Sequence, residues 1–481
     1  MLPELELLPG NACCKCIFSK SVTALLHQMA IFINRAAGIV SAVLLLVATG
    51  QASAKLTTAE ADRLGKDLTS VGAEQAGNKE GTIPAWTGGL TKAPPGWNRE
   101  NGYADPFADE KPLFAITAQN AEQYKNQLAP GVLSLLRKQP NFRMLVYPAH
   151  RTAAFPKDVT DASKAQATQV ESKGFGVQNL GDSTIPFPIP KNGLEAIWNH
   201  LMRFTGGSIE GDVNSFPVRS NGTYYKIRMH GARIYDRNMD QRTPNRLFVA
   251  KASFTEPVEL RGTIFLVHEP IDQVAESRSA WIYNAGARRV RRAPDLGYDG
   301  YNDGSEGMIT SDQFDGYNGA PDRYDWKLVG KREMYIPYNC YKMGDKKLKY
   351  ADMMLKGTVN PDYVRYELHR VWVVEATIKS AMSHTYARRT FYLDEDSWAV
   401  MIEETYGARG DIWRVALHGQ AQYYDVPVSG YRFGIVHDLD SGAYYISGLD
   451  NELKSVGTYN VKGRLLEFQP DALRREGGTT H

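Results

Sequence analysis

Alternation of apolar and polar residues dominates the second half of the chain. In the segment 364–378, apolar side chains occupy nearly every second position, and charged residues occupy most of the others. This period of two predicts a long, half-buried antiparallel strand. The segments 391–393 and 398–402 flank the acidic turn 394–397 and predict a β-hairpin. Further strands are predicted at 223–234, 246–255, 262–267, 280–283, 326–336, 413–417 and 442–448.

Helical spacing occurs earlier in the chain. In 193–204, apolar residues recur three and four positions apart, which predicts a short amphipathic helix. Residues 57–68 begin with a capping-box pattern, and 117–137 has helical spacing with a break at Pro130. Few helices are interleaved among the strands, which disfavours a parallel sheet. We therefore expect an α+β fold, in which a large curved antiparallel sheet has its concave face covered by helices.

The same change of pattern divides the chain into parts. Residues 55–214 are predicted to be a helical and irregular N-terminal part that wraps the sheet, and residues 215–470 to be the antiparallel β domain. The end of the chain, 471–481, is mostly polar and is expected to be a disordered tail.

The start of the chain has the layout of an export signal. Residues 29–54 contain Arg35, an apolar run and the small-residue pattern Ala-Ser-Ala that precedes a cleavage site. The apolar run is too short to span a bilayer. We expect cleavage before Lys55, where no cysteine could carry a lipid anchor, and a mature protein in the periplasm of a Gram-negative cell. Residues 1–28, ahead of Met29, are interpreted as an over-extended gene start.

Composition narrows the range of functions. The chain is 43% hydrophobic and can bury a sizeable core, while its net charge of +2 gives no field to attract nucleic acid. Cys340 is the only cysteine after the leader, so no internal disulfide is expected. The sequence has no nucleotide-binding loop, zinc-protease or serine-hydrolase signature, and its histidines lack metal-ligand spacing. We predict no metal and no cofactor, and a buried Cys340.

The segment 295–325 is acidic and rich in glycine and tyrosine. Its carboxylates Asp299, Asp303 and Glu306 are compatible with calcium, but Tyr301 and Thr310 stand where an EF-hand loop needs ligands. A solvated loop packed by its own tyrosines is therefore the favoured interpretation, and calcium binding stays open.

A cluster of arginines follows one of the predicted strands. Arg288, Arg289, Arg291 and Arg292 could contact an anionic headgroup or a partner protein. They could also form ion pairs with the acidic segment that follows, which is the favoured interpretation. In strand geometry Arg288 and Arg292 point to one side, and Arg289 and Arg291 to the other.

Large aromatic and sulfur-containing side chains are frequent in the predicted strands. Two interpretations have similar weight, namely an ordinary core and the lining of a pocket for an apolar ligand. On the second interpretation, the candidate ligand-binding residues are Trp281, Tyr283, Tyr366, Trp372, Tyr392, Trp398, Met401 and Trp413.

Several long motifs resemble a known bacterial family. They include KLTTAEADRLGKDL from Lys55, AWIYNAGARRVRRAP from residue 280, FDGYNGAPDRYDWKLVGKREMYIPYN from 314 and HRVWVVEATIK from 369. These motifs resemble the domain-of-unknown-function family 1329 over essentially the whole chain from Lys55 to Phe468. Its second half is similar to the LolA/LolB superfamily of periplasmic lipoprotein carriers, through the segments 281–292 and 392–398. The resemblance implies an incomplete antiparallel β-barrel whose helices plug an apolar cavity for acyl chains.

Three functional hypotheses follow. The favoured one is a periplasmic carrier or binding protein for a lipid or other hydrophobic molecule, which serves an envelope transport system and is not an enzyme. The resemblance implies an RND-type transporter and an outer-membrane protein as partners, so an assembly factor without its own ligand is the alternative. The third is a hydrolase for a hydrophobic substrate, in which His369 pairs with Asp394, Glu403 or Glu404.

Overall fold

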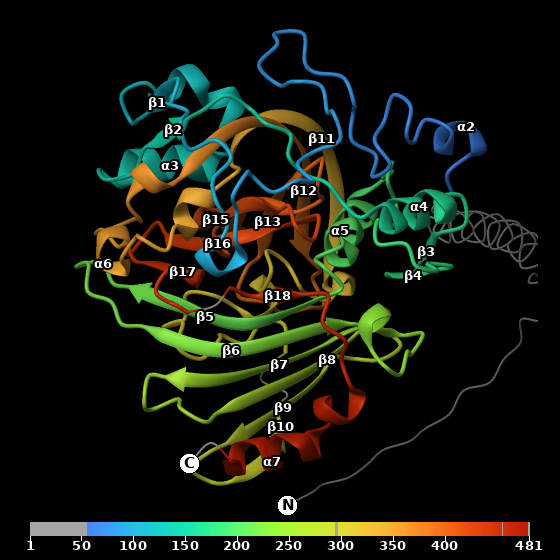
Figure 1. The fold of residues 1–481 in the computed structure, drawn as a ribbon, viewed down its shortest axis with the longest axis vertical. Helices are drawn as coiled ribbons and strands as arrows, with labels where there is room; N and C mark the ends of the chain where they lie inside the picture. Colours follow the sequence, from blue (N-terminus) through green and yellow to red (C-terminus); the bar gives the residue numbers. More distant parts are fainter. Residues whose placement is uncertain (1–54, 294–296, 455, 480–481) are drawn as a thin grey trace, which may run out of the picture. The chain divides into compact units, whose positions relative to one another are not determined.

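The computed structural model describes residues 55–293, 297–454 and 456–479. The leader predicted at 29–54 and the segment before it lie outside the described residues. Within the described part of the chain, one sheet of 16 strands is almost entirely antiparallel and has open edges (Figure 1). The expected α+β fold with a large antiparallel sheet is confirmed. Among the residues described, no helix is long and apolar enough to cross a membrane.

The sheet is built from two successive meanders. The first consists of β5 (Ser208–Val218), β6 (Ile227–Tyr235), β7 (Arg246–Glu256), β8 (Ile264–Pro270), β9 (Ser279–Asn284) and β10 (Arg289–Arg292). The second consists of β11 (Tyr324–Pro337), β12 (Arg365–Ile378), β13 (Arg388–Asp394), β14 (Val400–Tyr406), β15 (Ile412–Tyr423), β16 (Val428–Asp438) and β17 (Tyr444–Leu449). β17 pairs with β5 and so joins the two meanders, while β10 and β11 are the outer strands.

Shorter elements surround these meanders. The short strands β1 and β2 pair beside β12, β18 pairs with β5, and β3 and β4 form a separate hairpin; their bounds are Phe114–Ile116, Met144–Val146, Thr458–Tyr459, Glu171–Lys173 and Gly176–Gln178. The helices are α2 (Thr58–Ala61), α3 (Pro130–Lys138), α4 (Lys157–Gln166), α5 (Gly193–Met202), α6 (Tyr350–Met353) and α7 (Pro470–Thr479). The break predicted at Pro130 is confirmed, because α3 begins there after a separate 3₁₀ turn.

The structure moves several boundaries that the sequence pattern predicted. β5 begins at Ser208, ahead of the domain start expected at 215, and β1 and β2 of the expected wrapping part join the sheet. Residues 471–479, expected as part of a disordered tail, belong to α7. Leu473 explains this difference, because it is fully buried in a cluster beside β8 and β9 together with Phe468.

β12 differs from the half-buried strand that its pattern predicted. Arg365, Glu367, His369 and Arg370 are 6%, 0%, 1% and 8% exposed, so the first half of the strand is buried on both faces. The N-terminal part covers its polar face, where Arg365 donates to Glu110 over 2.6 Å. The charged positions of this strand therefore face other parts of the chain and not water.

The inner side of the sheet is occupied by α5 and by the segment 310–317. Within this segment Asp312 bonds Arg389 of β13, while Asp315 bonds Arg233 of β6. One short segment thus bonds strands of both meanders. α5 packs beside it against β11 and β12, which supplies the helical cover expected for this face. The prediction of a solvated loop was wrong, since Asp312 is 1% exposed.

Removal of Arg389 should destabilise the protein strongly. The side chain is fully buried between the carboxylates of Asp312 and Glu403, with 2.6 Å to the latter. In Arg389→Ala both carboxylates lose a buried partner, and breaking such a pair costs about 3–5 kcal/mol. Arg409→Ala, at a side chain that is 86% exposed, should change the free energy of unfolding by about 0.5 kcal/mol or less. Urea denaturation of the two variants measures the difference, and equal losses would contradict it.

Candidate functional site

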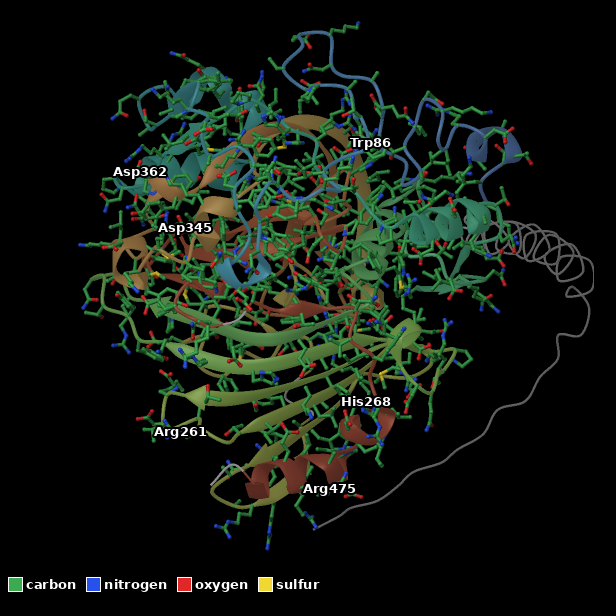
Figure 2. The ribbon with its side chains drawn as sticks, in the orientation of Figure 1. Trp86, Arg261, His268, Asp345, Asp362 and Arg475 are labelled. Carbon is green, nitrogen blue, oxygen red and sulfur yellow. The ribbon has the colours of Figure 1, made fainter. Side chains whose placement is uncertain are left out.

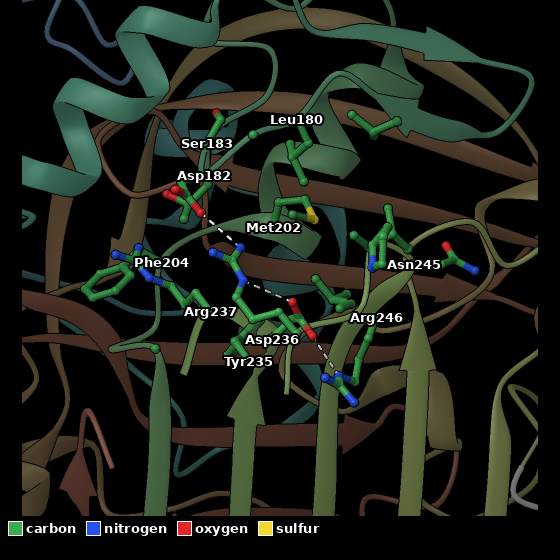
Figure 3. A pocket seen from close by; sticks show the side chains of 18 of the residues that line it. Leu180, Asp182, Ser183, Met202, Phe204, Tyr235, Asp236, Arg237, Asn245 and Arg246 are labelled. Atoms are coloured by element: carbon green, nitrogen blue, oxygen red, sulfur yellow. Dashed lines mark hydrogen bonds and ion pairs between the residues drawn. The ribbon is translucent and has the colours of Figure 1, made fainter. Parts of the chain in front are cut away.

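A cleft of about 510 Å³ lies between the end of α5, the loop that follows β4 and the turns that join β6 to β7 (Figure 3). Small-molecule sites occupy roughly 300–1,000 Å³. Two further cavities, of about 260 and 340 Å³, lie elsewhere in the described chain. The larger cleft combines an apolar lining with charged side chains, and we take it as the candidate site.

Part of the lining is apolar. Met202 ends α5, Phe204 follows it, and Leu247 comes from β7; these three side chains are 8%, 8% and 3% exposed. Leu180, in the loop after β4, lies beside Met202 (Figure 3). Because the core holds most of these side chains, the apolar surface is formed before any ligand arrives.

Two glycines let the chain turn sharply after α5. Gly206 and Gly207 have φ of 91° and 70°, a conformation that other residues rarely adopt. A Cβ on Gly207 would stand 2.7 Å from Oδ1 of Asn238, so a side chain does not fit there. This turn places Phe204 and Thr205 in the lining of the cleft.

The charged part of the lining is a series of ion pairs. Asp236 accepts from Arg246 over 2.8 Å and from Arg242 over 3.4 Å. Arg242 also donates to Asp182 over 3.0 Å, as the dashed lines in Figure 3 show. These contacts connect the loop after β4 to the turn between β6 and β7, and they neutralise two of the arginines.

Several buried polar atoms of the lining have no hydrogen-bond partner in the part of the chain that the structure describes. Nη1 of Arg237 is one of them, although its Nη2 donates to Asp158 over 3.2 Å. The hydroxyls of Thr184 and Thr205, residues that are 8% and 7% exposed, and Nε of Arg203 are also unpartnered. An unpaired buried polar group costs about 1–3 kcal/mol. This lining is therefore suited to a ligand that carries an acidic or other hydrogen-bonding group.

Arg203 connects the cleft to the buried charges of the inner face. It donates to Asp315 over 2.7 Å, and Arg233 donates to the second oxygen of the same carboxylate over 2.8 Å. Burial raises the pKa of Asp315, but the two arginines outweigh this effect and hold the pKa below its ordinary value. Burial lowers the pKa of His418, which lies near this network, to about 4. At neutral pH the network thus holds a charged carboxylate beside a neutral imidazole.

The structure separates the eight predicted ligand-binding residues. Most fall into three packed clusters: Tyr366, Tyr392 and Met401 with α3, Trp372 and Trp398 with α5, and Trp281 and Tyr283 with α7. Trp413 is half-buried and donates to Asp438 over 2.9 Å. None of the eight lines the three cavities described above. Their packing fits the interpretation as core residues, and contact with a ligand stays a prediction.

The predicted arginine cluster lies at an outer strand of the sheet. Arg289, Arg291 and Arg292 belong to β10, Arg288 precedes it, and all four are exposed. Arg292 stacks over the ring of Trp281 at 5.3 Å. The favoured interpretation, ion pairing with the acidic segment, is not seen within the described residues, where none of the four has a carboxylate partner.

The acid–base pair of the hydrolase hypothesis is not assembled in these cavities. Glu403 pairs with Arg389, and Glu404 accepts a hydrogen bond from the start of α3. His369 bonds Glu367 over 3.0 Å, but both side chains are buried and neither lines one of the three cavities.

Comparison with known proteins gives the family. Residues 115–474 match the family described as "Protein of unknown function (DUF1329)". The chain belongs to the DUF1329 family. A relative from Pseudomonas aeruginosa, named "Uncharacterized protein PA3922", is 46% identical over 439 residues, which cover 90% of this chain and 96% of the relative. The family predicted from the sequence motifs is confirmed.

Several solved structures are similar to parts of this DUF1329 protein. A domain named for outer membrane lipoprotein sorting, from Vibrio parahaemolyticus, has a TM-score of 0.42 at 14% identity and covers 59% of this chain and 98% of that one. A DUF1329 protein from Desulfovibrio piger has a TM-score of 0.39 at 14% identity and covers 56% of this chain and 92% of that one. LolA superfamily protein NE2245 from Nitrosomonas europaea has a TM-score of 0.33 at 13% identity and covers 54% of this chain and 91% of that one.

Sequence reasoning missed the cleft. Asp236, Arg237 and Arg242 lie between two predicted strands, and Arg246 begins the second one, so the dense alternation of arginine and aspartate was an available signal. The apolar lining comes from several separate segments, and no spacing rule connects them before the chain folds.

The buried imidazole of His418 should make the protein sensitive to acid. Its pKa is about 4 in the folded protein and 6.5 in the unfolded chain, so the unfolded chain takes up the proton first. Stability is then complete above about pH 6.5 and falls as the pH approaches about 4. This shift corresponds to about 3 kcal/mol. His418→Gln should reduce the fall in unfolding free energy between about pH 7 and about pH 4.5. An unchanged pH slope would show that His418 does not cause the effect.

Proposed function

We propose that this DUF1329 protein binds a hydrophobic molecule with an acidic headgroup and carries it through the periplasm. The cleft at the end of α5 supports the proposal, because its apolar lining lies next to a buried arginine nitrogen that has no partner. The export signal predicted at 29–54 supports the periplasmic location.

The apolar lining supplies the main driving force for binding. Each CH₂ group that leaves water for an apolar site contributes about 0.8 kcal/mol. An acyl chain against Leu180, Met202 and Leu247 would be held by this effect without any specific polar contact. The polar atoms of the cleft then select the headgroup.

Arg237 is the arginine best suited to an acidic headgroup. Arg242 and Arg246 already share the carboxylate of Asp236. Among the described residues, the only carboxylate bonded to Arg237 is Asp158, whose side chain is 71% exposed, and exposed pairs contribute only about 0–1 kcal/mol. Arg237 can therefore turn its unpartnered Nη1 toward a ligand carboxylate or phosphate at little energetic cost.

Comparing the binding of dodecanoate and dodecanol separates the contribution of the apolar lining from that of the headgroup contact with Arg237. Arg237→Gln should weaken dodecanoate binding about tenfold, because a hydrogen bond to a charged group contributes about 1.5–3 kcal/mol. Dodecanol binding should not change, since it carries no negative charge. Leu180→Asp should weaken both ligands, and Arg409→Gln, at an exposed arginine outside the cleft, should affect neither. Displacement of a fluorescent apolar probe measures the affinity of each variant and of the unmodified protein for both ligands.

Failure of the unmodified protein to bind either compound would refute the proposal. An equal loss of both ligands in Arg237→Gln would refute the assignment of the headgroup contact alone. Mass spectrometry of extracts from protein purified out of periplasm without detergent identifies the natural ligand.

We also propose that the exposed arginines at β10 hold the carrier against anionic lipid headgroups. Arg288, Arg289, Arg291 and Arg292 are exposed and have no carboxylate partner within the described residues. α7 packs against β10, and its exposed Arg475 adds positive charge beside this strand (Figure 2). The alternative is that the same arginines contact a transporter. The following experiment distinguishes this contact from binding to lipid headgroups.

Vesicle sedimentation tests the membrane contact. The unmodified protein should bind vesicles that contain phosphatidylglycerol and leave neutral phosphatidylcholine vesicles in solution. A basic side chain near an anionic surface contributes about 1 kcal/mol. Changing Arg288, Arg289, Arg291 and Arg292 together to Gln should therefore weaken binding at least about tenfold. Equal binding to both kinds of vesicle, or no effect of the substitutions, would leave the transporter contact as the better explanation.

A further inference from the structure

The turn between β13 and β14 holds three consecutive carboxylates inside the protein. Asp394, Glu395 and Asp396 are 0%, 2% and 3% exposed. Arg370 pairs with Glu395 over 3.1 Å, and Arg151 pairs with Asp396 over 2.6 Å. Asp394 has no arginine or lysine partner within the described residues, which makes it the exception in this turn.

Only one oxygen of Asp394 is satisfied. Its Oδ2 accepts from the hydroxyl of Ser397 over 2.6 Å and from the hydroxyl of Tyr338 over 3.3 Å. Its Oδ1 is buried and has no hydrogen-bond partner among the described residues. Buried carboxylates are normally paired, fully hydrogen-bonded or bound to a metal ion. The free oxygen therefore points to a positive group that protein atoms do not provide.

His369 of β12 lies close to Asp394. One ligand atom each from His369, Asp394 and Asp396 lie within 4.8 Å of one another, although no hydrogen bond joins the histidine to either aspartate. Nε2 of His369 is 3.0 Å from Glu367, and when it donates to that carboxylate, Nδ1 keeps a free lone pair. Metal-binding histidines usually donate their second ring N–H to a carboxylate in this way.

Strand register explains why these residues meet. Val371 of β12 stands opposite Asp394 at the end of β13, and the backbone N–H of Glu395 donates to the carbonyl of Arg370 over 3.1 Å. His369 stands two positions before Val371 on β12, and Asp396 lies in the turn that follows β13, so the register brings both close to Asp394. The hydrolase hypothesis paired His369 with Asp394 as one of three options, but nothing in the sequence added Asp396, which lies more than twenty positions from the histidine.

The surrounding charges leave room for a divalent cation. In the described residues, ion pairs and close contacts connect six carboxylates around this turn: Glu74, Glu110, Glu367, Asp394, Glu395 and Asp396. The arginines and lysine paired with them are Arg151, Lys331, Arg365 and Arg370. Apart from the imidazoles of His150 and His369, which bond Glu110 and Glu367, the carboxylates exceed these cations by two.

We propose that His369, Asp394 and Asp396 bind one divalent metal ion, with zinc as the first candidate and manganese as the second. One imidazole and two carboxylates suit either metal. The ion would link the turn after β13 to β12 and, through Asp396 and Arg151, to the N-terminal segment. Because the site is buried and outside the three cavities, its role is structural.

Metal content of the full-length exported protein tests this site directly. Protein purified without chelators is incubated with ZnCl₂ or, separately, with MnCl₂, and is then desalted for elemental analysis. The unmodified protein should retain about one equivalent of one of these metals. Asp394→Asn, which keeps the side-chain volume, should weaken retention at least about tenfold, and Glu367→Gln about 10–100-fold. Glu395→Gln, a buried carboxylate of the same turn that is not a ligand, should keep the metal.

Thermal unfolding provides an independent readout. A chelator should lower the melting temperature of the unmodified protein, and ZnCl₂ should restore it, because an ion bound only by the folded state stabilises that state. Asp394→Asn should respond to neither addition. The proposal is overturned if the unmodified protein retains less than about a tenth of an equivalent of both metals and its melting temperature ignores the chelator. The cluster would then hold a proton or a water molecule instead.

Discussion

The structure depends on neutralising charges that have been removed from water. Arg389 lies between Asp312 and Glu403, and Asp315 lies between Arg203 and Arg233. Asp312 and Asp315 thereby join the segment 310–317 to β13, to β6 and to the end of α5, and Arg389 also bonds Glu403 of the neighbouring strand β14. An unpaired buried charge is far more costly than an exposed one. Neither α5 nor the segment 310–317 can therefore leave the sheet without leaving several buried charges unpaired.

This constraint also decides where a ligand can bind. Since α5 and the segment 310–317 occupy the inner side of the sheet, the cleft forms at the end of α5, where the packed interior meets the surface. Arg203 belongs to both regions, because it bonds Asp315 and also lines the cleft. Binding in the cleft and stability of the core are therefore linked through one buried guanidinium.

Sequence patterns identified most elements but misjudged their surroundings. The long strand at 364–378, the hairpin around 394–397 and the helix at 193–204 all form close to their predicted bounds. The charged positions of β12 suggested water on one face, whereas an N-terminal segment covers them. The acidic segment 295–325 likewise suggested a solvated loop, because composition alone does not show that Arg389 and Arg233 will neutralise it.

By itself, the sequence determined the α+β class, the antiparallel strands and the family, because these depend on local periodicity or on contiguous motifs. Only the tertiary structure decided which charges meet, where the apolar cleft lies and that His369 comes close to Asp394 and Asp396. The physical reason is how far apart in the sequence the determining residues lie. A strand or helix is specified by neighbours within a few residues, whereas an ion pair, a cleft or a ligand set is specified by strand register and by the curvature of the whole sheet.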